Sequence, residues 1–193
     1  MYYTANQLIE KIPSLTTAEA ERYAKIVSKV IDGYIGYNLL DATRKITFSM
    51  ENPAKRISCP FGAIKSIIQS KVDGTTVAPK VFHDNIVEYE ECISGGDLYL
   101  EVTAGHGATV GDIDGLESIF IGMVDQLVQI QKAKGEDGNL SSITIGELQK
   151  SYNTKISNEQ SVQPLEEVLL QPYEEILAQY KYLFIFDNHW YLS

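Results

Sequence analysis

The sequence predicts an α+β protein: a helical, bundle-like core with a small antiparallel β-sheet inserted between the first long helix and the later helices. Two observations support this class. Apolar residues recur at helical spacing towards both ends of the chain, and they alternate with polar residues in between. The chain has 193 residues, 44% of them hydrophobic, which suits one domain with a real core. We expect that domain to span 1–182, followed by an extended aromatic tail over 183–193.

The N-terminal part, 1–44, is predicted to be helical, with its long helix over 17–38. Thr16 and Glu19 fit a capping box, in which each side chain satisfies a free backbone N–H at the helix start. The apolar residues that follow lie three or four positions apart, on one helix face: Ala20, Tyr23, Ile26, Val27, Val30, Ile31, Tyr34 and Ile35. Pro13 should end a short helix before it.

The central part, 45–104, changes to a period of two and predicts about four to six short antiparallel strands. Apolar residues at every second position mark two of them: Ile46, Phe48 and Met50, then Leu98, Leu100 and Val102. Two turns stand out between the strands. Asp73-Gly74 is a strong hairpin signal, and Gly95-Gly96 is a second glycine-rich turn.

The last helical part, 112–182, is predicted to hold two helices, over 114–134 and 165–182. Asp112 or Asp114 can cap the first of them, since a carboxylate accepts the free N–H groups of a helix start. Pro172 should kink or divide the second, because proline cannot donate a backbone hydrogen bond.

The charge balance argues against a dedicated nucleic-acid binder. Sixteen Lys and Arg stand against 26 Asp and Glu, giving a formal net charge of −10, whereas such a binder shows a basic surface. Cys59 and Cys92 lie far apart and form no metal-binding pair, which is typical of free thiols in a reducing compartment. We find neither a signal peptide nor a membrane-spanning apolar run, so synthesis in a cytoplasm is expected.

No catalytic or phosphate-binding motif is present, and no metal or other cofactor is predicted. His106, Asp112 and Asp114 could share a metal or act as a catalytic pair, but their spacing matches no known type of site. The simpler interpretation is a loop followed by a helix cap. His83, in a strand-like stretch, is expected to be structural. A small metal-dependent hydrolase using His106 and Asp112 stays open as an alternative to a protein that is not an enzyme.

The aromatic tail, 183–193, is the segment least like an ordinary chain end. Its candidate contact residues are Phe184, Phe186, His189, Trp190 and Tyr191. Chain ends are usually polar and poorly packed, so an aromatic end needs a surface to cover. Either the tail folds back over its own core, or it docks on another chain, where aromatic anchors are typical of interfaces.

Several stretches, taken in order, carry a family resemblance: Val30–Tyr37, Ile57–Pro60, Ile64–Ile67, Val72–Gly74, Leu100–Gly107, Asp112-Ile113, Ile143–Tyr152 and Leu169–Tyr173. Their order and spacing over roughly 15–180 resemble the head–tail connector (adaptor) proteins of tailed bacteriophages. The resemblance implies a virion protein that forms a ring of about a dozen copies beneath the portal. The ring would extend the DNA channel, let double-stranded DNA pass without specific binding, and offer a docking face to the tail or the next neck protein.

The resemblance also implies roles for two regions. Family members often anchor to the portal through their C-terminal region, which makes the aromatic tail the candidate portal contact. The turns at Asp73-Gly74 and Gly95-Gly96 are the candidate contacts for ring neighbours or for the distal face. A monomeric soluble adaptor without ring assembly is the alternative.

Overall fold

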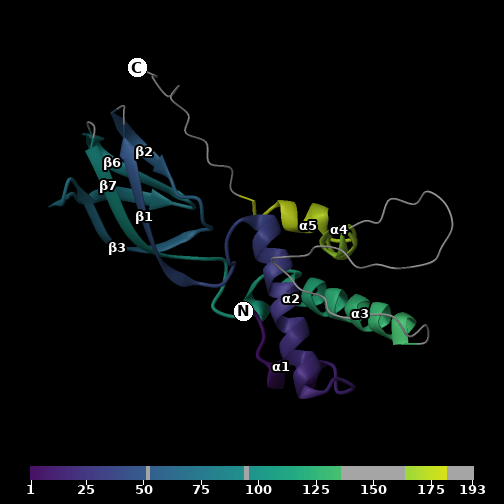
Figure 1. The fold of residues 1–193 in the computed structure, drawn as a ribbon. Helices are drawn as coiled ribbons and strands as arrows, with labels where there is room; N and C mark the ends of the chain where they lie inside the picture. The colour runs from purple at the N-terminus through teal and green to yellow at the C-terminus, as the bar shows by residue number, and fades with distance from the viewer. Residues whose placement is uncertain (51–52, 94–95, 136–163, 182–193) are drawn as a thin grey trace, which may run out of the picture. The chain divides into compact units, whose positions relative to one another are not determined.

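The computed structural model describes residues 1–50, 53–93, 96–135 and 164–181 (Figure 1). The described residues form two compact units: a helical unit within Met1–Tyr34 and Gly115–Leu177, and a β unit within Ile35–Asp114 and 178–181. The α+β class is confirmed, and the strands lie between the first long helix and the later helices, as predicted. The single domain over 1–182 stays a prediction.

The helical unit contains five helices in its described part: α1 (Ala5–Lys11), α2 (Thr17–Ile35), α3 (Leu116–Gly135), α4 (Leu165–Leu170) and α5 (Glu174–Ala178). Its N-terminal residues pack on α3. The rings of Tyr2 and Tyr3 lie 6.0 and 5.0 Å from the ring of Phe120, which is fully buried. Lys11 Nζ lies 2.6 Å from Glu117 Oε1, so α1 is also tied to the start of α3.

The predicted capping box of α2 is confirmed. The backbone N–H of Thr16 donates to Glu19 Oε2 at 2.9 Å, and the N–H of Glu19 donates to Thr16 Oγ1 at 3.3 Å. The Thr16 hydroxyl also donates to Glu19 Oε2, at 2.6 Å, and this bond, together with the one from the Thr16 N–H, lowers the pKa of the Glu19 carboxyl. The start of α2 was therefore readable from four residues of sequence.

The end of α2 lies earlier than predicted. The helix ends at Ile35 and not near Asn38, because Gly36 adopts a left-handed backbone with φ of +95° that stops helical propagation. The helical part predicted over 1–44 is too long for the same reason, since the first strand already begins at Ala42.

Pro172 divides the last predicted helix, as expected. α4 ends at Leu170 and α5 begins at Glu174, and the N–H of Tyr173 donates to the carbonyl of Leu170 at 2.7 Å across the break. The Tyr173 ring lies so close to Gly122 of α3 that any side chain at Gly122 would overlap its hydroxyl. The pair α4–α5 is thereby packed on α3.

The β unit contains seven strands in its described part: β1 (Ala42–Met50), β2 (Ala54–Ser58), β3 (Ile64–Val72), β4 (Thr75–Thr76), β5 (Pro79–His83), β6 (Ile86–Ile93) and β7 (Gly96–Ala104). They form a four-stranded sheet in the order β1-β7-β3-β4 and a three-stranded sheet in the order β2-β6-β5. All pairs are antiparallel. The sheet region is thus larger than the predicted four to six strands and is divided in two.

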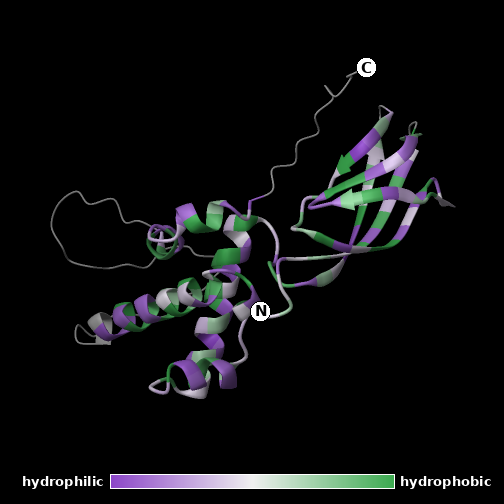
Figure 2. Ribbon diagram, turned by 180° about the vertical axis from the view of Figure 1, so that it is seen from behind, coloured by the Kyte–Doolittle hydropathy of each residue, from purple (hydrophilic) through white to green (hydrophobic). Residues whose placement is uncertain are grey.

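One hydrophobic core joins the two sheets. It is formed by buried residues of both: Phe48, Leu98, Leu100, Val102 and Ala104 from the four-stranded sheet, and Ile57, Val87, Tyr89 and Ile93 from the three-stranded one. Figure 2 shows the apolar and polar residues alternating along these strands. Within the core the hydroxyls of Ser70 and Tyr89 lie 2.8 Å apart and satisfy each other.

Candidate functional site

The two turns that the sequence singles out meet at one end of the four-stranded sheet. The N–H of Asp73 donates to the carbonyl of Asp97 at 3.0 Å, and the N–H of Asp97 donates to Asp73 Oδ1 at 2.8 Å. Ser49 Oγ, near the end of β1, donates to Asp97 Oδ1 at 2.7 Å. The ends of β1, β3 and β7 are therefore linked into one tip, which we call the hairpin tip.

The shape of the hairpin tip depends on left-handed backbone. Asp73 and Gly74 have φ of 47° and 80°, the combination of a type I′ hairpin turn. Gly96 has φ of +100°, and a side chain there would overlap the carboxylate of Asp73. Asparagine, aspartate and glycine tolerate such angles, and most other residues do not.

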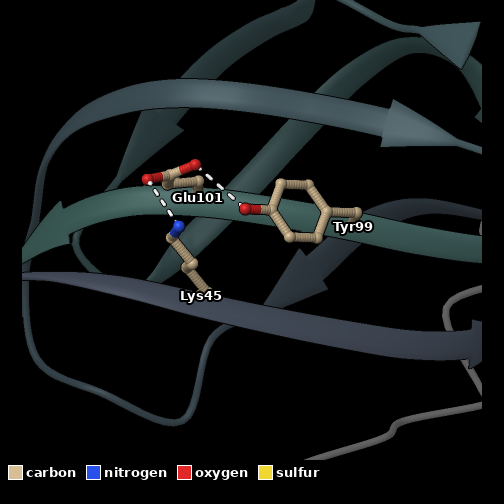
Figure 3. A network of polar contacts seen from close by, with 3 residues as sticks. All are labelled: Lys45, Tyr99 and Glu101. Atoms are coloured by element: carbon tan, nitrogen blue, oxygen red, sulfur yellow. Dashed lines mark hydrogen bonds and ion pairs between the residues drawn. The ribbon is translucent and has the colours of Figure 1, made fainter. Parts of the chain in front are cut away.

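A polar network lies on the outer face of the same sheet (Figure 3). The hydroxyl of Tyr99 donates to Glu101 Oε2 at 2.9 Å, and Lys45 Nζ lies 3.6 Å from Glu101 Oε1. The bond to the carboxylate raises the pKa of Tyr99. Because these residues alternate with the core residues of β1 and β7, the sheet has one apolar face and one polar face.

Tyr37, His106 and Tyr180 form a cluster in the β unit that we call the tyrosine clamp. The hydroxyl of Tyr37 donates to the carbonyl of Tyr180 at 2.7 Å and lies 2.9 Å from His106 Nε2. Since its hydrogen is already donated, this hydroxyl accepts from His106, which places a proton on Nε2. The His106 and Tyr180 rings meet edge to face at 4.9 Å, and the Tyr180 hydroxyl donates to the carbonyl of Asp114 at 3.0 Å.

His106 is a packed residue within this cluster. Burial lowers the pKa of its imidazole, with the Asp84 carboxylate acting in the opposite direction. Any side chain at Gly62 would overlap the His106 ring. Burial thus favours the neutral form of the histidine, which is held from two sides.

The Asp112 side chain caps a short 3₁₀ helix, η1 (Val110–Asp112). The expectation that Asp112 caps the long helix is wrong. The N–H and Oγ1 of Thr109 donate to Asp112 Oδ2 at 2.7 and 2.9 Å, which lowers the pKa of that carboxyl. Asp114 contributes its carbonyl to Tyr180. α3 instead begins at Leu116, after Gly115 with φ of +70°.

The remaining candidate groups lie apart from these. His83 is exposed on β5. Both cysteines are free: Cys59 is buried, which raises the pKa of its thiol to about 12, and Cys92 is exposed. Across the described residues, no group of three or more His, Cys, Asp or Glu side chains could hold a metal ion.

Comparisons with known proteins find chains of similar fold in solved structures of particle necks. No protein-family model and no curated protein matches the chain. A chain from the neck of an empty GTA particle, computed with C6 symmetry, superposes with a TM-score of 0.55, covering 89% of this chain and 88% of that one at 11% identity. The fold is neck-like. A chain from the neck of the native GTA particle, computed with C12 symmetry, gives a TM-score of 0.54 at 14% identity and covers 74% of this chain and 83% of that one.

Within the neck-like fold, the candidate contact residues fall into two groups. Asp73, Gly74 and Gly96 belong to the hairpin tip. Gly95 and the aromatic tail lie outside the described residues, so the tail residues Phe184, Phe186, His189, Trp190 and Tyr191 keep their roles as predictions. No helix in the described part is long and apolar enough to cross a membrane.

The tyrosine clamp was not predicted from the sequence. The sequence leaves His106 open as a metal ligand or catalytic residue beside the simpler interpretation as a loop residue, and it assigns no contact to Tyr37 or Tyr180. No local signal links residues so far apart, since Tyr37 and Tyr180 are separated by 143 positions. The clamp fixes the chain in the β unit immediately before the aromatic tail.

Proposed function

We propose that this protein is a structural subunit of a phage-like neck, which assembles as a ring beneath the portal and extends the DNA channel. The observation that supports this most is the neck-like fold, which covers nearly nine tenths of both chains in the first comparison. Rotational symmetry of the compared necks supports a ring, and a ring of about a dozen copies fits the C12 assembly. As a neck subunit the protein would be part of the virion.

The role we propose is not enzymatic and needs no cofactor. The residues that a hydrolase would have used are engaged in packing: His106 in the tyrosine clamp and Asp112 in the cap of η1. A general base or metal ligand needs a free lone pair facing a substrate. Here Nε2 of His106 is bonded to the Tyr37 hydroxyl and the His106 ring packs against Tyr180, and the Asp112 carboxylate accepts two bonds from Thr109.

The aromatic tail is the proposed portal contact. The tyrosine clamp supports this by holding the chain in the β unit up to Tyr180, so the tail starts from a fixed point. A tethered segment with a fixed origin loses less freedom on docking than a free one. The hairpin tip is the proposed contact with ring neighbours or with the tail or next neck protein.

The acidic composition suits DNA in transit. Lys and Arg side chains hold DNA by neutralising its phosphates, and this chain has ten fewer of them than of Asp and Glu, 16 against 26. We propose that double-stranded DNA passes the lumen without being bound.

Negative-stain imaging and light scattering of the full chain, alone and with its portal, test the proposal. We expect closed rings in at least one of the two samples. A chain that stays monomeric in both would contradict the proposal and favour the monomeric adaptor. Hydrolysis that depends on added metal and is lost in His106→Ala would favour the hydrolase.

A further inference from the structure

The helices α4 and α5 both expose acidic and apolar side chains, which together we call the acidic surface. Its residues are Glu166, Glu167, Val168, Glu174, Glu175 and Ile176, all of them exposed. Val168 is 37% and Ile176 is 44% exposed, although both helices bury their leucines against the rest of the unit. Exposed aliphatic side chains are unfavourably hydrated, and the glutamates around them attract positive charge. A cationic partner could therefore cover this surface.

The helix α2 presents a surface of opposite charge, which we call the basic stripe. Arg22, Lys25 and Lys29 lie three or four positions apart, and all three are exposed on one helix face. The small residues Ala18 and Gly33 continue the same face. Nothing lies within 4 Å of where a Gly33 side chain would stand, so the face is open.

The two surfaces belong to one unit but face different ways. Lys25 and Lys29 lie opposite the buried face of α2, which carries Tyr23, Val27 and Ile31. Arg22, at the edge of the stripe, donates from Nη2 to Gln131 Oε1 of α3 at 2.5 Å. The hydroxyl of Tyr34, which lies outside the stripe, donates to the carbonyl of Glu174 at 3.3 Å, so α5 meets α2 away from the stripe. Among the described residues, none of the three cations and four carboxylates takes part in an ion pair.

We propose that the basic stripe of one copy docks on the acidic surface of the next copy, as the lateral contact of the ring. The inference rests on the proposed function, since it names the partner and the surfaces of that assembly. Lysine stems would cover Val168 and Ile176 while their ammonium groups reach the glutamates. Because the two surfaces are different, the contact is head-to-tail, the geometry that gives a ring when its rotation closes.

Charge reversal tests the contact directly. We expect Lys25→Glu with Lys29→Glu to abolish rings at concentrations where the unchanged chain forms them, and Glu174→Lys with Glu175→Lys to do the same. Combining all four changes should restore rings, because the attraction returns with opposite sign. Lys132→Glu on α3 and Glu10→Lys on α1 are matched controls, since both residues are exposed outside the two surfaces.

Cross-linking at low protein concentration tests the same contact independently. In a Cys92→Ser background, Lys29→Cys and Glu175→Cys are made as separate proteins and mixed with a short bis-maleimide. We expect the linked heterodimer to form in the mixture far faster than linked homodimers form in either protein alone. Linking of each protein only with itself would overturn the head-to-tail contact.

The outcomes separate the two proposals. Rings that persist in both charge-reversed variants would overturn the lateral contact and leave the ring function standing. An unchanged chain that forms no rings, alone or with the portal, would overturn the ring function. In that case the cross-linked heterodimer decides whether the contact exists without a ring.

Discussion

Asp73 and Asp97 join two hairpin turns through a reciprocal pair of hydrogen bonds, one between backbones and one to the Asp73 carboxylate. A single hairpin end is usually free to move, because only its own strands hold it. Here three strand ends move together, since Ser49 of β1 bonds the same Asp97. A rigid tip can present a defined surface to a neighbour at little cost in conformational entropy.

Replacing Gly96 by alanine should lower the free energy of unfolding. Alanine resists a φ of +100°, at a cost of about 1–2 kcal/mol, and its methyl group would push the Asp73 carboxylate aside. Urea denaturation of the two proteins measures the difference. Gly33→Ala is the matched control: this glycine lies in α2 with open space around it, so alanine should stabilise by about 0.5–1 kcal/mol. Equal effects of the two changes would contradict the assigned backbone of the tip.

Removing the Tyr37 hydroxyl should loosen the base of the aromatic tail. Tyr37→Phe leaves the Tyr180 carbonyl and His106 Nε2 without their shared partner, at a cost of about 1–3 kcal/mol. Hydrogen exchange should then quicken at the N–H of Lys181, which bonds the carbonyl of Ala178. Tyr34→Phe, which loses an exposed hydroxyl bond, should leave that exchange rate unchanged.

The stability of the β unit should fall as the pH drops below about 6.5, the ordinary pKa of histidine. Burial lowers the pKa of His106 in the folded state, so the unfolded chain takes up a proton first and is favoured. The loss continues until the pH reaches the lowered pKa. Melting curves between pH 5 and 7.5 should show this slope, and His106→Gln should flatten it. Asp112 acts separately, because its lowered pKa costs stability only below about pH 3.8.

The two thiols should react at very different rates. Burial raises the pKa of Cys59 to about 12, so almost no thiolate is present at neutral pH, whereas Cys92 is exposed. A thiol reagent should modify one group quickly in the native protein and the second only after denaturation. Cys92→Ser should remove the fast phase. A fast phase that survives this change would place Cys59 at the surface.

The helices were largely predictable because their signals are local. Thr16 and Glu19 set the start of α2, and Pro172 divides α4 from α5, each within a few residues of sequence. The end of α2 was missed because Gly36 is read equally well as a weak helical residue or as a left-handed stop. The strands were found through alternation, but which strands pair is set by contacts between distant residues, so the division into two sheets was missed.

The site residues also differ in whether their signals are local or depend on contacts between distant residues. The turns at Asp73-Gly74 and Gly96 need a left-handed backbone, and the Asp and Gly residues that favour it are visible in the sequence. Their meeting through Asp97 depends on strand order, which no short motif encodes. The tyrosine clamp is harder still, because its members lie in three distant segments and each has an ordinary explanation as a core aromatic. The ligand role of His106 stays open in the sequence as an alternative to a loop residue, because its packing partners lie in distant segments.

Truncation after Tyr182 should remove binding to the portal while leaving the fold intact. The described core ends with the tyrosine clamp, whose last member is Tyr180, so the cut spares the clamp and the other contacts among the described residues. The lost segment contains the aromatic residues that we propose as anchors, and losing a cluster of such anchors typically costs several kcal/mol of binding, or more than about a hundredfold in affinity. Co-sedimentation with portal rings measures the loss, and circular dichroism checks the fold. A truncated chain that joins portal rings as well as the full chain would move the portal contact to another surface, with the hairpin tip as the next to be changed.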